Sequence, residues 1–283
     1  MKPTEDEWCE RIGLALRLLE ERLGEDVSLE ELAQAASYSM FHFHRLFRGL
    51  MGESVREYSR RLLLERAAHH LTHGDNDILH IALDAGYDSH EAFTRAFKER
   101  FGVTPSLFRE ERREVHSQRA RSTNETPIDI RIEKRSAARI ACVRHVGPYD
   151  QVGSAWAKLM KWGWTKMVFG KPDTFGLCFD DPDITPGERV RYEACMVVDA
   201  KAKPKGDIEI REIPASSYAV TVHEGSFQTI GLTYSRLFAR IATGPIDNTN
   251  CELGDPPSLE KYLADPRKIK PEDMRTEIWM PVC

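Results

Sequence analysis

The sequence predicts an α+β protein in which an all-α region, residues 1–114, precedes an α+β region, residues 128–283. Two internal repeats predict this division. A helix–turn–helix pattern occurs twice in the first region, at an offset of 49 to 50 residues, and a pattern of strands around one helix occurs twice in the second, at an offset of 78. The helical region ends in a helix that starts at Pro105 and runs out near Arg113. Residues 115–127, rich in Ser, Thr, Arg and Asn, are the predicted linker.

The helical region opens with an amphipathic helix over residues 7–23. Two helix–turn–helix units follow, residues 27–50 and residues 76–101. Ser28 and Glu31 form a capping box at the start of the first unit. Small residues then recur in the first helix of each unit, which lets the second helix cross at close range.

The second helix of each unit separates into two faces at 3.6 residues per turn. Phe43 and Phe47 in the first unit, like Phe93 and Phe97 in the second, form an apolar stripe that we expect to pack inward. The opposite stripes combine side chains that can contact base edges in the major groove of DNA, and the alternative is an ordinary solvated face. These stripes are Phe41, His44, Arg45 and Arg48 in the first unit and His90, Glu91, Thr94, Arg95 and Lys98 in the second.

A helix over residues 54–73 separates the two units, and 20 residues at 1.5 Å each span about 30 Å. Successive major grooves on one face of B-DNA lie about 34 Å apart, so this helix could set two readers one groove apart. Residues 1–120 carry 17 Lys and Arg against 22 Asp and Glu, although a DNA-binding domain is commonly basic. Because the acid is concentrated in the first helix, we assign the phosphate contacts to Arg45, Arg48, Arg56, Arg60, Arg61, Arg95, Lys98 and Arg109.

The second unit carries a long and specific pattern. It consists of Gly86, Tyr87, Ser89, Phe93, Arg95, Phe97, Lys98, Phe101, Gly102, Thr104, Pro105, Phe108 and Arg109. This pattern resembles the signature of the arabinose-regulator (AraC/XylS) family of bacterial transcription factors, and the resemblance covers roughly residues 8–112. It implies a monomeric unit whose two second helices enter adjacent major grooves of double-stranded DNA. By position, the implied base readers are Phe41, His44 and Arg45, then His90, Glu91, Thr94 and Arg95.

Each copy of the second repeat predicts alternating strands, a glycine turn, a helix and two further strands, hence two pseudo-symmetric β-α-β-β halves. The final strand aligns with an earlier one at an offset of 84, so Glu277 and Glu193 occupy related positions. Glu277 shares a strand face with Trp279, and a carboxylate beside an indole could attract an organic cation. The alternative is a glutamate that is solvated or pairs with Arg275 or Arg191.

Residues 128–283 also resemble a known family. The motifs are His145-Val-Gly-Pro-Tyr149, Asp180-Asp-Pro182, Ile213-Pro-Ala215 with Tyr218, Glu224-Gly225 and Thr276-Glu-Ile-Trp-Met-Pro281. They resemble those of gyrase-inhibitor-like (GyrI-like) effector-binding domains, which often bind drug-like or cationic compounds between their two halves. The resemblance implies a pocket with a central glutamate, which maps to Glu277, ringed by aromatic residues. By position the pocket comprises Glu277, Glu193, Tyr149, Trp156, Phe175, Tyr192, Tyr218, Tyr234 and Trp279.

Composition narrows the remaining possibilities. The six cysteines form no CxxC pair, so we interpret them as reduced and structural and predict neither a metal site nor a cofactor. No catalytic residue is assigned. No apolar run approaches the length of a membrane span and no leader sequence opens the chain, so we expect a soluble, cytoplasmic protein without a membrane partner.

Together these features predict a transcriptional regulator that binds a promoter and whose activity is changed by a small lipophilic effector. If Glu277 binds the effector, we expect the effector to be cationic. The effector would act on DNA binding directly or through a partner such as RNA polymerase. The alternative is a protein that sequesters or hydrolyses a small molecule through Glu277, with DNA binding serving autoregulation. Some relatives of the GyrI-like domain hydrolyse small strained-ring compounds, which keeps that alternative open.

Overall fold

The computed structural model divides into two compact units, each described here by itself. The helical unit comprises residues 1–71 and 76–108, and the sheet unit comprises residues 72–75 and 109–283. Among the described residues, no helix is both long enough and apolar enough to cross a membrane. The structure describes residues 5–122, 128–164, 173–247, 249–264 and 268–283.

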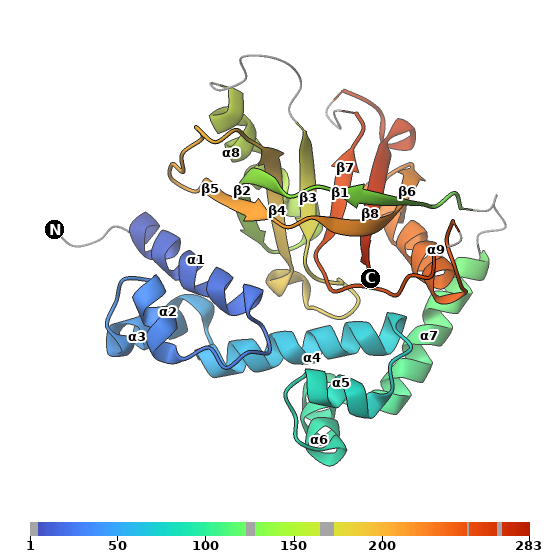
Figure 1. The fold of residues 1–283 in the computed structure, drawn as a ribbon, viewed down its shortest axis with the longest axis horizontal. Helices are drawn as coiled ribbons and strands as arrows, with labels where there is room; N and C mark the ends of the chain where they lie inside the picture. The colour runs from blue at the N-terminus through green and yellow to red at the C-terminus, as the bar shows by residue number, and fades with distance from the viewer. Residues whose placement is uncertain (1–4, 123–127, 165–172, 248, 265–267) are drawn as a thin grey trace. The chain divides into compact units, whose positions relative to one another are not determined.

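The helical unit contains the two predicted helix–turn–helix motifs, α2–α3 and α5–α6, which α4 connects (Figure 1). The capping box of Ser28 and Glu31 is present, and Ser39 and Ser89 cap α3 and α6 as N-terminal residues. Both α3 and α6 end at a glycine in the left-handed region. The helices are α1 (Glu5–Glu21), α2 (Leu29–Ala35), α3 (Met40–Met51), α4 (Val55–His73), α5 (Ile78–Asp84), α6 (His90–Phe101) and α7 (Pro105–Ser122).

Aromatic residues form the core of each motif, as their helical spacing predicted. In the first motif, Phe47 lies between Phe43 and Tyr58 of α4, with ring centroids 5.7 Å away in each case. In the second, Phe97 contacts Phe93 and the start of α7 through Phe108, at 5.5 and 5.2 Å. Each recognition helix is therefore fixed on its inward face by large rings, which leaves the opposite face free to present polar side chains.

Arg61 does not contribute a phosphate contact, contrary to the prediction. Its side chain is only 8% exposed and forms ion pairs with Glu53, 2.7 Å away, and Glu65, 3.2 Å away. Glu65 in turn accepts a hydrogen bond from Arg100 of α6 at 2.8 Å. The arginine therefore ties α4 to α6 within the helical unit, because its spacing on α4 points it inward.

The predicted linker is largely helical. The last helix was predicted to end near Arg113, but α7 continues to Ser122, and residues 123–127 of the predicted linker lie outside the described residues. This stretch has no apolar stripe, so periodicity gave no signal for a helix. Its arginine, glutamate and glutamine residues nevertheless favour helical backbone, which explains the extension.

The sheet unit contains the predicted duplication, and each half reads strand, strand, helix, strand, strand. All eight strands form one antiparallel sheet in the order β1-β6-β8-β7-β3-β4-β2-β5. The first half comprises β1 (Arg131–Arg135), β2 (Ala138–Val146), α8 (Gly153–Trp164), β3 (Thr174–Cys178) and β4 (Arg191–Val197), and the second comprises β5 (Glu209–Ile213), β6 (Ser216–Glu224), α9 (Ile230–Ala242), β7 (Ser258–Tyr262) and β8 (Arg275–Val282).

The two halves exchange their first strands. β1 of the first half pairs with β6 of the second, and β5 of the second half pairs with β2 of the first. The centre of the sheet is the antiparallel pair of β3 and β7, where the halves meet. Two histidines close the equivalent turns: the Nε2 atoms of His145 and His223 lie 3.2 and 3.0 Å from the carbonyl oxygens of Pro148 and Ser226.

Helices α8 and α9 pack on the sheet through separate apolar clusters. Leu159 of α8 packs among residues of β2 and β4 that include Tyr192. Leu237 of α9 packs among residues of β6 and β8 that include Ile278. Side chains of a strand alternate between faces, so the residues on either side of Tyr192 and Ile278 point to the opposite face of the sheet.

Candidate functional site

The predicted base readers lie on the exposed faces of α3 and α6. Phe41 is 79% exposed, a large fraction for an aromatic ring, and His44, Arg45 and Arg48 are exposed beside it. On α6, His90, Glu91, Arg95 and Lys98 are exposed as well. Among the described residues, Arg45, Arg48, Arg95 and Lys98 form no close ion pair, although Glu57 interacts electrostatically with Arg48 and Glu91 with Arg95.

Two residues of the α6 stripe have local roles that the sequence did not indicate. Hydrogen bonds from its own backbone N–H and from Ser89 lower the pKa of Glu91, so this carboxylate helps to cap the helix. Thr94 is only half exposed, and its hydroxyl oxygen is buried without a hydrogen-bond partner. His90, Arg95 and Lys98 remain as the exposed members of this stripe without such a local role.

A second candidate site surrounds Glu260 of β7, a residue that sequence reasoning missed. Tyr234 of α9 donates a hydrogen bond to one carboxylate oxygen, and Tyr262 of β7 donates to the other, each at 3.1 Å. Glu260, Tyr234 and Tyr262 are all half-buried. Among the described residues, the partners recorded for Glu260 are hydroxyls and the Cys178 thiol, and no cationic side chain pairs with it.

A chain of hydrogen bonds leads from α8 to this carboxylate. The indole N–H of Trp156 donates to the Tyr192 hydroxyl at 2.8 Å, and that hydroxyl lies 2.9 Å from the Tyr262 hydroxyl. Because Tyr262 gives its single proton to Glu260, Tyr192 must donate to Tyr262. The donors are thus ordered in one direction, Trp156 to Tyr192 to Tyr262 to Glu260, and all favour a negative charge at the end.

Burial and hydrogen bonding oppose each other at Glu260. Burial raises the pKa of its carboxyl group, and hydrogen bonds from Tyr234, Tyr262 and Cys178 lower it, with a net rise. Burial also raises the pKa values of Tyr192, Tyr234 and Tyr262 well above the ordinary range, so these hydroxyls stay protonated donors. The site is therefore a carboxylate that lacks a counter-charge in a shell of phenol and indole groups.

Gly176 makes this arrangement possible. It lies directly opposite Glu260 in the β3–β7 pair. A Cβ atom on Gly176 would lie 2.2 Å from the Tyr192 hydroxyl oxygen and 2.6 Å from its ring, so only glycine lets this tyrosine lie over the strand. The offset of 84 residues that relates the final strands also relates Gly176 to Glu260. Gly176 of the first half leaves room for the Tyr192 ring, and Glu260 of the second half carries the carboxylate.

The structure divides the predicted ligand-binding residues between the two faces of the sheet. Four of them lie on the two helices or on the sheet face that α8 and α9 cover, which is also the face of Glu260. These are Tyr149, Trp156, Tyr192 and Tyr234. The other five lie on the opposite face, so the structure corrects the prediction of a single cluster around Glu277. These are Phe175, Glu193, Tyr218, Glu277 and Trp279.

Strand register explains the division. In the pairing of β7 with β8, Glu260 lies opposite Ile278, and Glu277 lies opposite Lys261. Directly paired residues share a face and neighbours along a strand alternate, so Glu260 and Glu277 point in opposite directions. Glu277 cannot reach the ring of Tyr192 or Tyr234 through the sheet.

Both symmetry-related glutamates on the opposite face already have cationic partners. Glu277 accepts a hydrogen bond from Arg131 at 2.8 Å and one from the Trp279 indole at 3.1 Å. Glu193 is paired with Arg211. Arg131 lies on β1 of the first half and pairs with Glu277 of the second, and Arg211 lies on β5 of the second half and pairs with Glu193 of the first. Each ion pair therefore joins an exchanged strand to the other half. The arginines proposed from the sequence pair elsewhere, Arg191 with Asp180 and Arg275 with Glu224.

A signal for Glu260 was present in the sequence. The offset of 84 maps residues 174–178 onto residues 258–262, which predicts the central strand β7 that was left unassigned. In that strand Glu260 and Tyr262 are two residues apart and therefore share a face. Extending the repeat from the final strand to its neighbour would have found both residues.

Comparison with known proteins agrees with this architecture. Residues 128–282 match the family model of the GyrI-like small molecule binding domain, more than half of the chain, and residues 32–111 match that of a helix-turn-helix domain. The probable transcription factor PqrA of Proteus vulgaris is 39% identical over 97 residues, which cover 34% of this chain and 80% of PqrA. The right origin-binding protein of Escherichia coli is 40% identical over 91 residues, 32% of each protein.

This chain spans about a third of the length of two of its curated relatives, 31% of an uncharacterized helix-turn-helix regulator of Bacillus subtilis and 32% of the right origin-binding protein. A solved structure of an EcmrR–DNA complex covers 90% of this chain and 99% of its own, at 15% identity and a TM-score of 0.45. The helix–turn–helix repeat, its signature residues, the match to the helix-turn-helix family model and the similarity to PqrA identify the first part of the chain. The chain belongs to the GyrI-like family of small-molecule-binding domains, preceded by an AraC-type helix-turn-helix domain.

Proposed function

We propose that this chain is a transcriptional regulator that binds double-stranded DNA through α3 and α6 and binds a small lipophilic cation at Glu260. The observation that carries the ligand proposal is a half-buried carboxylate bonded to hydroxyl groups, with no cationic side chain beside it among the described residues. Burying such a charge is costly unless a counter-ion neutralises it. A bound cation supplies that counter-ion, and the nearby aromatic rings supply apolar surface and cation–π contacts.

Regulation requires that the ligand bind two states of the protein with different affinity. The DNA-bound chain would then alter the action of RNA polymerase at a promoter, by direct contact or by occupying the site. The exposed cations Arg45, Arg48, Arg95 and Lys98 on the two recognition helices support the DNA-binding part of this proposal.

The test compares two isosteric hydrophobic ions, tetraphenylphosphonium and tetraphenylborate, on the full-length protein and on two matched variants. Glu260→Gln removes the proposed counter-charge, and Glu277→Gln removes the equivalent charge on the opposite face of the sheet. We expect Glu260→Gln to weaken binding of the phosphonium about 10- to 100-fold, since a charge-assisted contact contributes about 1.5–3 kcal/mol. Glu277→Gln should leave that affinity unchanged, and neither variant should weaken binding of the borate.

The pH dependence gives the same proposal a second readout. The pKa of Glu260 is raised in the free protein, so a cation that needs the ionised form must displace a proton. Phosphonium affinity should therefore fall as the pH drops through that pKa, and the fall should be absent in Glu260→Gln. Equal losses in the two variants, or a flat pH profile in the unaltered protein, would contradict recognition by Glu260.

The same protein samples address the hydrolytic alternative. A carboxylate with a raised pKa in an apolar site can act as a general base on water, which is the one observation that favours an enzyme. Stoichiometric binding without product supports a sensor. Catalytic turnover of a strained-ring compound that is lost in Glu260→Gln would support a hydrolase instead.

A further inference from the structure

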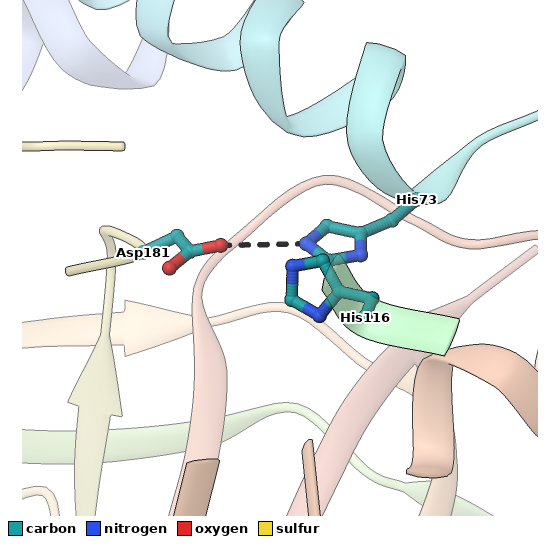
Figure 2. A group of neighbouring side chains, drawn as sticks. All are labelled: His73, His116 and Asp181. Carbon is teal, nitrogen blue, oxygen red and sulfur yellow. Dashed lines mark hydrogen bonds and ion pairs between the residues drawn. The ribbon is translucent and has the colours of Figure 1, made fainter. Parts of the chain in front are cut away.

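A second cluster of titratable side chains lies in the sheet unit, and none of its members contacts Glu260 in the part of the chain that the structure describes. It consists of His73 at the end of α4, His116 on α7 and Asp181 in the loop after β3 (Figure 2). One ligand atom from each residue lies within 4.8 Å of the other two. The sequence predicted no metal site because its cysteines form no CxxC pair, but this cluster contains no cysteine. Its members are 43 and 65 residues apart, so they form no short motif.

The distance between His73 and Asp181 suits a shared ion. His73 Nε2 and Asp181 Oδ2 are 3.3 Å apart, which is long for a charge-assisted hydrogen bond. Two ligand atoms that each lie about 2.0–2.1 Å from a tetrahedral zinc ion are separated by about 3.3 Å. His73 and Asp181 are therefore already at the separation that a shared ion requires. The ligand atom of His116 lies within 4.8 Å of both and needs to move by up to about 1.5 Å to join them.

Neighbouring residues fix the orientation of His116. Its Nδ1 lies 3.0 Å from the hydroxyl oxygen of Ser235, and that hydroxyl donates its own proton to the carbonyl oxygen of Gly231. Ser235 must therefore accept from the Nδ1–H of His116, which leaves the Nε2 lone pair for another partner. A histidine metal ligand is commonly held in this way by a hydrogen bond at its second ring nitrogen.

The other two side chains are held in place as well. The ring of His73 stacks on Phe238 of α9, with centroids 3.7 Å apart and an interplanar angle of 15°. Asp181 accepts a hydrogen bond from the backbone N–H of Asp183 on Oδ1 at 2.8 Å, which leaves Oδ2 directed toward His73. Phe238 and Ser235 lie one turn apart on α9, so this helix orients both histidines.

The charge state of the cluster also suits a cation. The nearby Arg119 is paired with Asp183, which compensates its positive charge. The carboxylate of Asp181 then supplies the negative charge that a divalent ion requires.

We propose that His73, His116 and Asp181 bind a divalent transition-metal ion of the zinc type, with three protein ligands and a fourth position for water. Nitrogen and oxygen ligands of this kind are typical of zinc sites. The site would join the end of α4, α7 and the loop after β3 within the sheet unit.

The test uses the full-length protein, stripped of metal and titrated with Co²⁺ as a spectroscopic stand-in for Zn²⁺, followed by competition with Zn²⁺. We expect one ion per chain with the visible absorption of tetrahedral cobalt bound to nitrogen and oxygen. His116→Gln and Asp181→Asn should each weaken binding at least tenfold, and Ser235→Ala should weaken it about tenfold through the lost orientation of His116.

His80→Gln is the matched control. His80 Nε2 also lies 3.3 Å from a carboxylate, that of Asp84, but both side chains are exposed and belong to no three-ligand cluster among the described residues. Its loss should not change cobalt binding. Circular dichroism checks that each variant is folded, and a variant that fails to fold is replaced by Ser235→Ala as the deciding one. No stoichiometric binding, unchanged binding in the cluster variants, or a strong sulfur-to-cobalt charge-transfer band would overturn the proposal.

Discussion

Two glutamates of the sheet unit show how the immediate partners of one residue type decide its role. Glu277 is held by Arg131, so its counter-charge is part of the chain. Glu260 is held by tyrosine hydroxyls, which stabilise negative charge without neutralising it. A carboxylate of the first kind contributes to the fold, whereas one of the second kind gains most from a cation that arrives from outside.

On the DNA-binding side, Arg95 and Lys98 provide a comparison between two cations of one helix face. We expect Arg95→Ala to cost about 1–3 kcal/mol on the preferred site and to remove discrimination at one base pair, since arginine contacts guanine with two hydrogen bonds. Lys98→Ala should weaken binding by a similar factor on all sequences, because a phosphate contact carries no sequence information. Binding measured on a panel of single-base variants of a selected DNA site separates the two effects.

The opposite pattern would reassign these residues. If Arg95→Ala weakened binding equally on every sequence of the panel, Arg95 would be a phosphate contact. Arg61→Ala is unsuitable as a DNA-contact control, because its guanidinium belongs to the buried network with Glu53 and Glu65, and its loss would destabilise the helical unit.

At the level of elements, the β3–β7 pair positions the candidate ligand site. Gly176→Ala should force Tyr192 away from its position over β3, since the new methyl group would lie 2.2 Å from the tyrosine oxygen. We expect a loss of about 1–3 kcal/mol in the free energy of unfolding from overpacking. Phosphonium binding should weaken too, because the hydrogen bonds from Trp156 through Tyr192 toward Glu260 would be broken.

Gly153→Ala serves as the control for this substitution. Gly153 begins α8, and a Cβ atom there meets nothing within 4 Å. Alanine favours helix over glycine by up to about 1 kcal/mol, so this variant should be as stable as the unaltered protein or more stable. Chemical denaturation and ligand titration of both variants check the prediction, which fails if Gly176→Ala behaves like Gly153→Ala.

Elements with strong periodicity or clear caps could be predicted from the sequence, and elements defined by tertiary contacts could not. The aromatic stripes of α3 and α6 and the capping box at Ser28 were recognised because their signals are local. The polar residues of α7 beyond Arg113 gave no hydrophobic period and were assigned to a linker. The short strand β7 is central only because β3 and β8 lie on either side of it, which no local pattern reports.

The candidate sites illustrate the same limit. Of the residues predicted to surround Glu277, Tyr149, Trp156, Tyr192 and Tyr234 lie with the helices, whereas Glu277 itself lies on the opposite face of the sheet. A shift of one position along a strand is enough to reverse a side chain, so the identity of the central glutamate depended on the register of β7 with β8. The cluster of His73, His116 and Asp181 has no sequence motif at all.

For the whole molecule, the balance of charge predicts how DNA binding depends on salt. The chain has a net charge of −5, so long-range attraction to DNA must come from the cations on the recognition helices and α4 rather than from the overall field. If about four to five exposed cations contact phosphates, the slope of log affinity against log salt should be about −4.

The measurement is a salt titration of the full-length protein on a selected DNA fragment. Lys98→Ala should reduce the magnitude of the slope by about 1, because one released counter-ion is lost. A slope near zero would contradict phosphate contact by these residues and would place the acidic side chains of the chain closer to the DNA than we infer.

The exchange of β1 and β5 between the halves has a consequence for the origin of the sheet unit. Each half leaves the edge of its own long second strand to be completed by the first strand of the other. A single half made alone would therefore have an unpaired edge on its second strand and a first strand without a pairing partner. A second copy could pair with both. Gene fusion of such a swapped pair would retain the contacts between its members while letting their sequences diverge, so that one member could keep glycine where the other acquired an acid.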